Sequence, residues 1–116
     1  MFGPGRDRLL VDGEAVAPLV VARSSGERRR GLLGTSAVEG ALWLPRCPSV
    51  HMVGMHYPID VAMLDRHGVC RLVLTLRVGG MTRPRLRVRT CVEAAAGAMA
   101  AWGVAPGRLL AVGARG

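Results

Sequence analysis

The chain has 116 residues, half of them hydrophobic, and carries a formal net charge of +8 from 16 basic and 8 acidic side chains. This length suits a single domain over residues 1–116, and the apolar fraction can build a core without a disulfide or a structural metal. The composition excludes an intrinsically disordered chain, and no segment approaches the ~18 consecutive apolar residues of a membrane span. Three cysteines without a CxxC pair favour reduced thiols, so we expect a soluble, cytoplasmic protein.

The basic residues are all arginine, in a chain rich in alanine, glycine and valine. This bias is typical of codon usage in a GC-rich genome, and that interpretation needs no special function. The alternative is a surface that attracts nucleic acid, anionic lipid or an acidic partner, because a large net charge favours association with ligands of opposite sign.

The first elements that the sequence predicts are the two strands of a hairpin. Residues 9–11 and 15–22 are mostly apolar, and Asp12-Gly13 between them is a strong turn signal. The segment GERRRGLL at 26–33 then predicts a short helix, because serines precede it and a glycine follows it.

A second hairpin is the clearest structural prediction in the centre of the chain. Residues 41–44 first predict a short apolar strand that ends at a proline. Residues 59–64 and 69–76 predict two strands joined by a turn at 65–68. Side chains alternate between the faces of a strand, so the first of these strands should direct two sets to opposite sides: Ile59, Val61 and Met63, and Asp60, Ala62 and Leu64.

The last third of the chain predicts two more strands and a helix. Residues 83–90 alternate, which predicts a strand with four arginines on one face, and Pro84 confines it to a strand start or a sheet edge. Residues 92–102 predict a short alanine-rich helix that stops at Gly103, and residues 108–112 a final strand. The fold class expected is α+β, mainly β: a small, compact, mostly antiparallel, barrel-like domain with one or two short helices.

Residues 49–65, SVHMVGMHYPIDVAMLD, concentrate the unusual polar residues. Asp60 lies within an apolar strand, so it is either held by a salt bridge or turn-capping hydrogen bond, or is a pocket carboxylate with an altered pKa. His51 and His56 could take part in acid–base chemistry near neutral pH. Asp60 with Glu93 is a further possible acid–base pair, if the fold brings the two together.

The same run offers soft metal ligands and a thiol, because thiolate, thioether and imidazole groups suit copper(I) or zinc. No spacing matches a standard zinc pattern, and methionine is also ordinary core filler in a chain with few aromatics. A Cys–His nucleophile pair lacks a recognisable orienting residue. The metal interpretation therefore stays secondary; its residues are Cys47, His51, Met52, Met55 and His56.

The arginine-rich segment at 83–89 has two interpretations. A basic ribbon could follow a phosphate backbone in nucleic acid. Alternatively, charge keeps an exposed edge strand from pairing with other chains. We favour the second, because the aromatic side chains that stack on single-stranded bases are missing there.

Several motifs together resemble the family called domain of unknown function 192. They are RRRGLLG at 28–34, SVH at 49–51, Met55, PIDV at 58–61, LD at 64–65, GV at 68–69, EAAAG at 93–97, Gly103 and PG at 106–107. The resemblance covers about residues 15–113, and the arginine–glycine–leucine and Pro-Ile-Asp elements are fairly specific in combination.

The resemblance implies a small β-rich domain but no activity, since the family is itself functionally uncharacterised. This chain departs from the most similar version of the family pattern at Met52, where a threonine is expected, and at His56, where an arginine is expected. Arg108 stands where the family has an aspartate. A function that needs a cation at 56 or a carboxylate at 108 is therefore not expected here.

Taken together, the sequence favours a non-catalytic binding or accessory protein with a pocket around the SVHMVGMHYPID segment. A small hydrolase-type enzyme using His/Asp acid–base chemistry and a basic nucleic-acid-binding module are the alternatives. No cofactor is implied, and a protein partner and a small molecule both stay open. The candidate ligand-binding residues are Arg28, His51, Met55, His56, Asp60 and Glu93.

Overall fold

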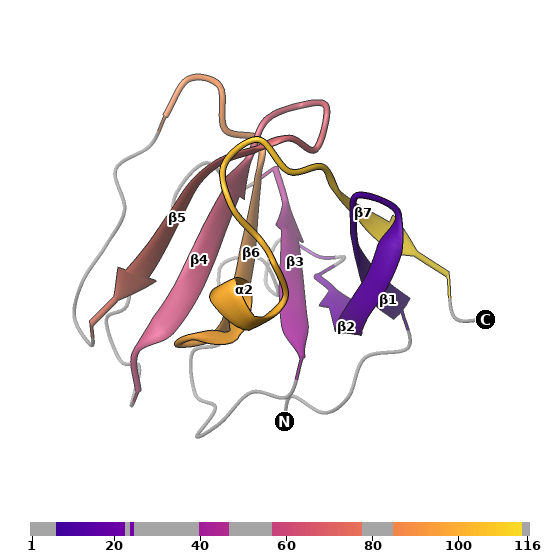
Figure 1. The fold of residues 1–116 in the computed structure, drawn as a ribbon. Helices are drawn as coiled ribbons and strands as arrows, with labels where there is room; N and C mark the ends of the chain where they lie inside the picture. The colour runs from indigo at the N-terminus through magenta and orange to yellow at the C-terminus, as the bar shows by residue number, and fades with distance from the viewer. Residues whose placement is uncertain (1–6, 23, 25–39, 47–56, 78–84, 115–116) are drawn as a thin grey trace.

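A computed structural model describes residues 7–22, 24, 40–46, 57–77 and 85–114. Within these ranges one seven-stranded sheet runs in the order β5-β4-β6-β3-β2-β1-β7 (Figure 1). All neighbouring strands are antiparallel except β2 and β3. The elements are β1 (Asp7–Val11), β2 (Glu14–Val21), β3 (Ala41–Pro45), β4 (Ile59–Leu64), β5 (Cys70–Leu76), β6 (Thr90–Ala95), α2 (Ala98–Ala101) and β7 (Leu110–Gly113).

Both predicted hairpins are confirmed. Strands β1 and β2 pair through a turn in which Asp12 and Gly13 both have positive φ, 51° and 85°. A two-residue turn of this kind matches the right-handed twist of the strands, and glycine adopts its second position without strain. Strands β4 and β5 pair from Ile59 to Leu64, and the predicted strand at 41–44 is β3.

Strand β4 is buried on both faces, and all six of its residues are buried. Its alternation is confirmed: Ile59, Val61 and Met63 pack in one apolar cluster, whereas Ala62 and Leu64 pack in the other. The short helix α2 covers the second cluster, where the side chain of Met99 is fully buried. The sheet therefore has a core on each side of its central strands.

The predicted fold class is confirmed as mainly β with a short helix, and the sheet is mixed and is not closed into a barrel. Within the described residues, an isolated bridge between Val69, just before β5, and Leu109, just before β7, links the two outer strands at one corner. Backbone bonds surround this bridge: Cys70 N–H donates to Arg108 O at 2.8 Å, and Leu110 N–H donates to Gly68 O at 2.9 Å. The corner ties the turn after β4 to the last strand.

Two sequence predictions in the last third of the chain are wrong. Residues 85–89 are not a strand: Val88 N–H donates to Arg85 O at 3.1 Å and closes a turn. Leu86 is fully exposed at the turn, although the alternation had placed it on an apolar face. Alternation of arginine with apolar residues is therefore not sufficient to form a strand where no neighbouring strand lies alongside.

The helix predicted over 92–102 begins only at Ala98, because residues up to Ala95 form strand β6. Alanine has a high helix propensity, but β6 lies between β3 and β4 and its residues at 91–94 are buried, so tertiary packing overrides that propensity. The predicted stop at Gly103, with φ of 76°, is confirmed. The helix predicted over 26–33 lies outside the described residues.

No helix within the described ranges is long and apolar enough to cross a membrane.

Candidate functional site

Only two of the six ligand-binding candidates lie in the described part of the chain. They are Asp60 and Glu93. Arg28, His51, Met55 and His56 lie outside it, as do Cys47 and Met52 of the metal hypothesis. Within the described ranges no three His, Cys, Asp or Glu residues are grouped so that they could hold a metal ion.

Asp60 is held inside the structure by three hydrogen bonds. Its Oδ1 accepts from Thr75 Oγ1 at 2.6 Å, and its Oδ2 accepts from the backbone N–H groups of Gly97 and Met99 at 2.9 and 3.2 Å. Only 4% of its surface is exposed. Buried carboxylates need such donors, because leaving one without them costs several kcal/mol. Asp60 thus links β4 to β5 and to the start of α2. Its hydrogen bonds to Gly97 and Met99 cap the turn that leads into α2.

Glu93 does not lie beside Asp60. In the β4–β6 pairing Asp60 is opposite Ala94, whereas Glu93 is opposite Val61. Ala94 packs in one apolar cluster and Val61 in the other, so the two carboxylates point to opposite faces of the sheet. The strand register therefore does not assemble the acid–base pair considered from the sequence.

A second aspartate, Asp65, immediately follows β4 and organises the turn to β5. Its Oδ1 accepts from the N–H groups of His67 and Val69 at 2.8 and 3.0 Å. Its Oδ2 accepts from Nε and Nη2 of Arg71, both at 2.9 Å. Burial alone would raise the pKa of Asp65, but these donors outweigh burial and hold that pKa below 3.8. The turn is therefore fixed around an ionised carboxylate.

The loop before β6 lies against this turn. Arg89 N–H donates to Leu64 O at 2.8 Å, which continues the β4–β6 pairing past its last strand residue. Val88 is buried in the apolar cluster that contains Met63, so its side chain anchors the loop. Two parts of the chain about 20 residues apart in sequence, 65–71 and 85–89, therefore meet at one end of the sheet.

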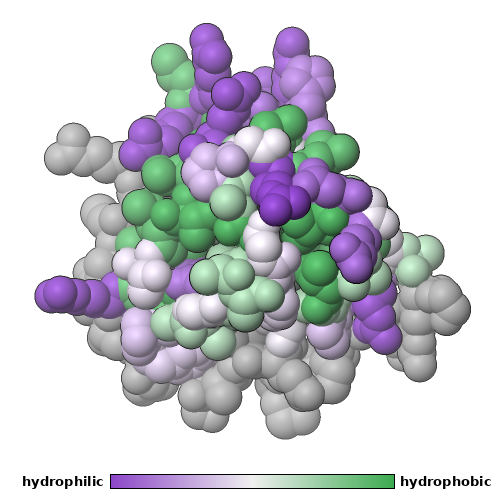
Figure 2. All heavy atoms as spheres, in the orientation of Figure 1, coloured by the Kyte–Doolittle hydropathy of each residue, from purple (hydrophilic) through white to green (hydrophobic). Residues whose placement is uncertain are grey.

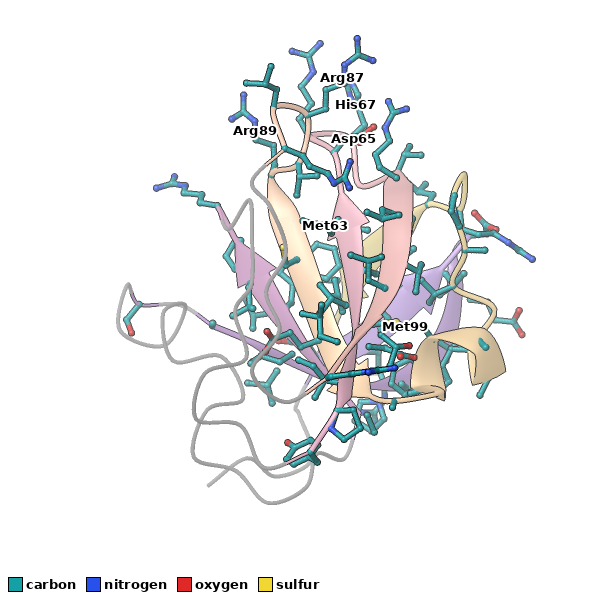
Figure 3. All side chains as sticks on the ribbon, turned by 90° about the vertical axis from the view of Figure 1, so that its left-hand side faces the viewer. Met63, Asp65, His67, Arg87, Arg89 and Met99 are labelled. Carbon is teal, nitrogen blue, oxygen red and sulfur yellow. The ribbon has the colours of Figure 1, made fainter. Side chains whose placement is uncertain are left out.

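A cavity of about 300 Å³ lies between the turn and the loop. Figure 3 shows the labelled side chains of Asp65, His67, Arg87 and Arg89 at this end, above Met63 and away from Met99. Hydrophilic side chains gather at the same end in Figure 2. We call this feature the arginine pocket; its lining residues are Asp65, Arg66, His67, Arg71, Leu86, Arg87 and Arg89.

The arginine pocket carries an excess of positive charge. Four arginines line it against the single carboxylate of Asp65, and that carboxylate is already bonded to Arg71. Arginine presents a planar fork of donors that matches phosphate and carboxylate oxygens, and it stays charged at any ordinary pH. The remaining guanidinium groups, on Arg66, Arg87 and Arg89, suit an anionic ligand.

The arrangement does not resemble a nucleophilic active site. The lining residues include no serine, threonine or cysteine. The imidazole of His67 accepts a bond at Nε2 from Arg66 Nε at 3.2 Å, and Asp65 contacts the backbone N–H of His67. Within this pocket the Asp65 carboxylate accepts from the backbone N–H of His67 and not from its imidazole, so the orienting contact of a His–Asp pair is not formed here.

Sequence reasoning singled out part of this pocket but not its assembly. The turn at 65–68 was predicted, and the arginines at 83–89 were noted as a possible ribbon. Arg66, His67 and Arg71 were not recognised as neighbours of Arg87 and Arg89. The missing information was the pairing of Leu64 with Thr90, which is long-range and carries no local sequence signal.

Comparisons with known proteins identify relatives of uncharacterised function. The family model of DUF192, described as "Uncharacterized ACR", matches residues 8–112. A solved structure of a protein of unknown function from Novosphingobium aromaticivorans DSM 12444 is 19% identical, with a TM-score of 0.76; the match covers 90% of this chain and 83% of that one.

A second solved structure is that of a protein from Sinorhizobium meliloti 1021 proposed to be a transcription regulator. It is 17% identical, with a TM-score of 0.79, and the match covers 97% of each chain. At these identities both structures show a shared fold and nothing more. No curated protein matches the chain.

Proposed function

The chain belongs to the DUF192 family of uncharacterised proteins, and from this premise we propose that it is a non-catalytic binding domain whose arginine pocket takes a phosphate-bearing ligand. The observation that carries the proposal is the surplus of guanidinium groups around a cavity large enough for a small anion. Charge-assisted hydrogen bonds of this type contribute roughly 1.5–3 kcal/mol each, so two or three of them give measurable affinity.

The rigidity of the pocket supports binding. The Asp65 carboxylate fixes the turn, while the Arg89 N–H and the buried Val88 side chain fix the loop. A site whose backbone is already in place loses less entropy when the ligand arrives. Only the arginine side chains have to become ordered.

A binding role rather than a catalytic one is supported by the pocket's chemistry. The lining provides cations and a bonded carboxylate, but no hydroxyl or thiol that could attack a substrate. The hydrolase alternative depends on His51 or His56, which lie outside the described residues. A pocket around residues 49–60 and a cytoplasmic location stay predictions from the sequence.

Nucleic-acid binding is a second candidate, because the same arginines could contact a phosphate backbone. The structural neighbour from Sinorhizobium meliloti, proposed to be a transcription regulator, is in line with it at the level of fold. Against it, the arginines surround one cavity rather than an extended ribbon, and neither 65–71 nor 85–89 contains a phenylalanine, tyrosine or tryptophan for stacking.

The direct test is calorimetric titration with inorganic pyrophosphate at low ionic strength. The double variant Arg87→Gln/Arg89→Gln should weaken binding by at least about ten-fold, because two charge-assisted contacts are lost. Affinity should also fall as salt is added. Arg77→Gln is the matched control: this exposed arginine follows β5 about 20 Å from Arg71, so affinity should hardly change.

Pyrophosphate binding that is absent, or that Arg77→Gln reduces as much as the pocket variant does, would refute the proposal. The second outcome would indicate attraction to the net charge of +8 rather than to a site.

A further inference from the structure

Leu86 is the most exposed large apolar side chain among the described residues. Its relative accessibility is 103%, against 46% for Leu109 and 40% for Val112. It lies in the turn that Val88 N–H closes on Arg85 O, so it projects from the apex of the loop. A leucine that contacts nothing in its own fold has a large apolar area still to bury.

Charged side chains surround this leucine. Arg85 and Arg87 flank it in sequence, and Arg66, Arg71 and Arg89 line the cavity beside it. The two segments 65–71 and 85–89 together carry five arginines against the one carboxylate of Asp65. Half of the chain's net charge of +8 is thus concentrated around one exposed apolar residue.

We infer that the phosphates recognised here belong to an anionic lipid surface, with Leu86 entering the apolar layer and the surrounding arginines contacting the headgroups. This inference rests on the proposed phosphate-binding function and names its ligand. An apolar residue at the tip of a basic surface matches the two parts of a membrane interface, where anionic headgroups lie above hydrocarbon.

A lipid surface fits these features better than the other sources of phosphate. A free phosphate ion would bind the guanidinium groups alone, and its binding would not require an exposed leucine. Nucleic acid offers its apolar surface as base faces, and aromatic side chains are the usual partners for those. Hydrocarbon accepts a leucine in any orientation, because the hydrophobic effect is not directional.

The conformation of the loop keeps Leu86 exposed to solvent. Val88, two residues on, is buried in the apolar cluster with Met63, and Arg89 N–H is bonded to Leu64 O. The turn that contains Leu86 is therefore held at the end of the sheet by the packing of Val88 and by the hydrogen bond of Arg89 N–H to Leu64 O. Insertion would need no rearrangement of the core.

The test is sedimentation of the full chain with lipid vesicles, run beside the pyrophosphate titration. Vesicles of phosphatidylcholine with phosphatidylglycerol should bind the protein, and vesicles of phosphatidylcholine alone should bind it weakly. Leu86→Ser should reduce partitioning onto the anionic vesicles by about ten-fold. It should lower the pyrophosphate affinity far less, because Leu86 lines the pocket without contributing a charge or a hydrogen-bond donor. The fully exposed position of Leu86 means that folding should be unaffected.

Two further variants complete the experiment. Arg87→Gln/Arg89→Gln should weaken vesicle binding by roughly five-fold per arginine and weaken pyrophosphate binding as well. Val112→Ser, at a partly exposed position on β7, is the matched apolar control and should change neither measurement.

The outcomes separate the inference from the function on which it rests. Pyrophosphate binding without vesicle binding, or vesicle binding that ignores Leu86→Ser, overturns the lipid inference and leaves the phosphate site. Tighter binding to an RNA or DNA oligonucleotide than to anionic vesicles also overturns it. Failure of pyrophosphate to bind overturns the proposed function and the inference that rests on it, whether or not vesicles bind.

Discussion

The two ends of strand β4 carry an aspartate each, and they differ in what surrounds it. Asp60 is bonded to a hydroxyl and two backbone N–H groups, all neutral donors inside the core. Asp65, about 17 Å along the strand, is bonded to two backbone N–H groups and to Arg71. Beyond Arg71, three more arginines line the adjoining pocket.

The comparison separates a carboxylate that holds the core together from one that borders the proposed binding site. At Asp60, hydrogen bonds from three neutral donors of the described chain occupy the carboxylate oxygens and bring no cation to the site. At Asp65 the cations outnumber the carboxylate, so the surplus is available to a ligand of opposite sign. The balance of charge around a carboxylate therefore distinguishes a ligand-binding position from a structural one better than the burial of that carboxylate does.

The largest effect on stability should come from replacing Asp60, whose hydrogen-bond donors are all neutral. Asp60→Ala leaves the Thr75 hydroxyl and the Gly97 and Met99 N–H groups without their acceptor. We expect the free energy of unfolding to fall by about 3 kcal/mol, since each buried donor left unbonded is costly. Urea denaturation followed by circular dichroism measures this change.

Asp60→Asn is the matched variant for that experiment, because one side-chain oxygen remains to accept a hydrogen bond. Its loss of stability should be about half as large. If Asp60→Ala instead left the stability intact and abolished ligand binding, Asp60 would be a ligand-binding residue rather than a structural one.

An intermediate effect on stability is expected from adding a side chain at Gly68, in the turn between β4 and β5. Gly68 has φ of 85°, and a Cβ there would lie 2.6 Å from Leu110 O. Gly68→Ala should destabilise the protein by about 2 kcal/mol through both the backbone conformation and the clash. Gly13→Ala is the control, because Gly13 has the same φ but nothing within 4 Å of the added carbon.

The difference between these two alanine variants, measured by thermal unfolding, isolates the close approach of the turn to β7. Equal losses of stability would mean that the contact between Gly68 and Leu110 tolerates a methyl group, and that the corner of the sheet is looser than described.

The smallest effect, and the sharpest for the comparison, should come from Asp65→Asn. The amide oxygen can still accept from His67 and Val69, but the ion pair with Arg71 is lost. Stability should fall by about 0.5–1 kcal/mol, because solvent around the half-exposed side chain of Arg71 screens this ion pair even though Asp65 is buried. Pyrophosphate affinity should rise by roughly five-fold, because Arg71 becomes available and a negative charge is removed.

The same variant should alter the dependence of stability on pH. The folded-state pKa of Asp65 lies below 3.8, so its ionised form contributes stability above that pH. This contribution is lost as the pH falls through the folded-state pKa. Asp65→Asn should therefore show a shallower loss of stability below about pH 4. Unchanged acid unfolding together with weaker pyrophosphate binding would contradict both parts of the prediction.

Local signals were sufficient for much of the fold. Asp12-Gly13 specified the first hairpin, and the alternation at 59–64 specified which side chains of β4 share a face, because turns and strand periodicity are written in adjacent residues. The alanine-rich segment misled, since residues 91–95 are a strand only where β3 and β4 already flank them. Small side chains carry no period that could reveal this.

The candidate site was harder to predict than the fold. Asp60 was noticed because it is polar within an apolar run, and that signal indicates a buried hydrogen-bond acceptor as readily as a ligand-binding residue. The pocket arginines looked like ordinary surface charge, because Arg66 and Arg87 become neighbours only through the pairing of Leu64 with Thr90. Whether charges accumulate at one place depends on strand register, which sequence spacing alone does not give.

The placement of β7 has a consequence for synthesis of the chain. The β1–β2 hairpin is made first, yet the outer edge of β1 pairs with β7, and Asp12 accepts from Leu109 N–H. Until the last strand has left the ribosome, the nascent chain therefore carries an edge with unpaired backbone groups, the type of edge that recruits other strands. Slow translation of the segment that leads to β7 would prolong the exposure of the β1 edge.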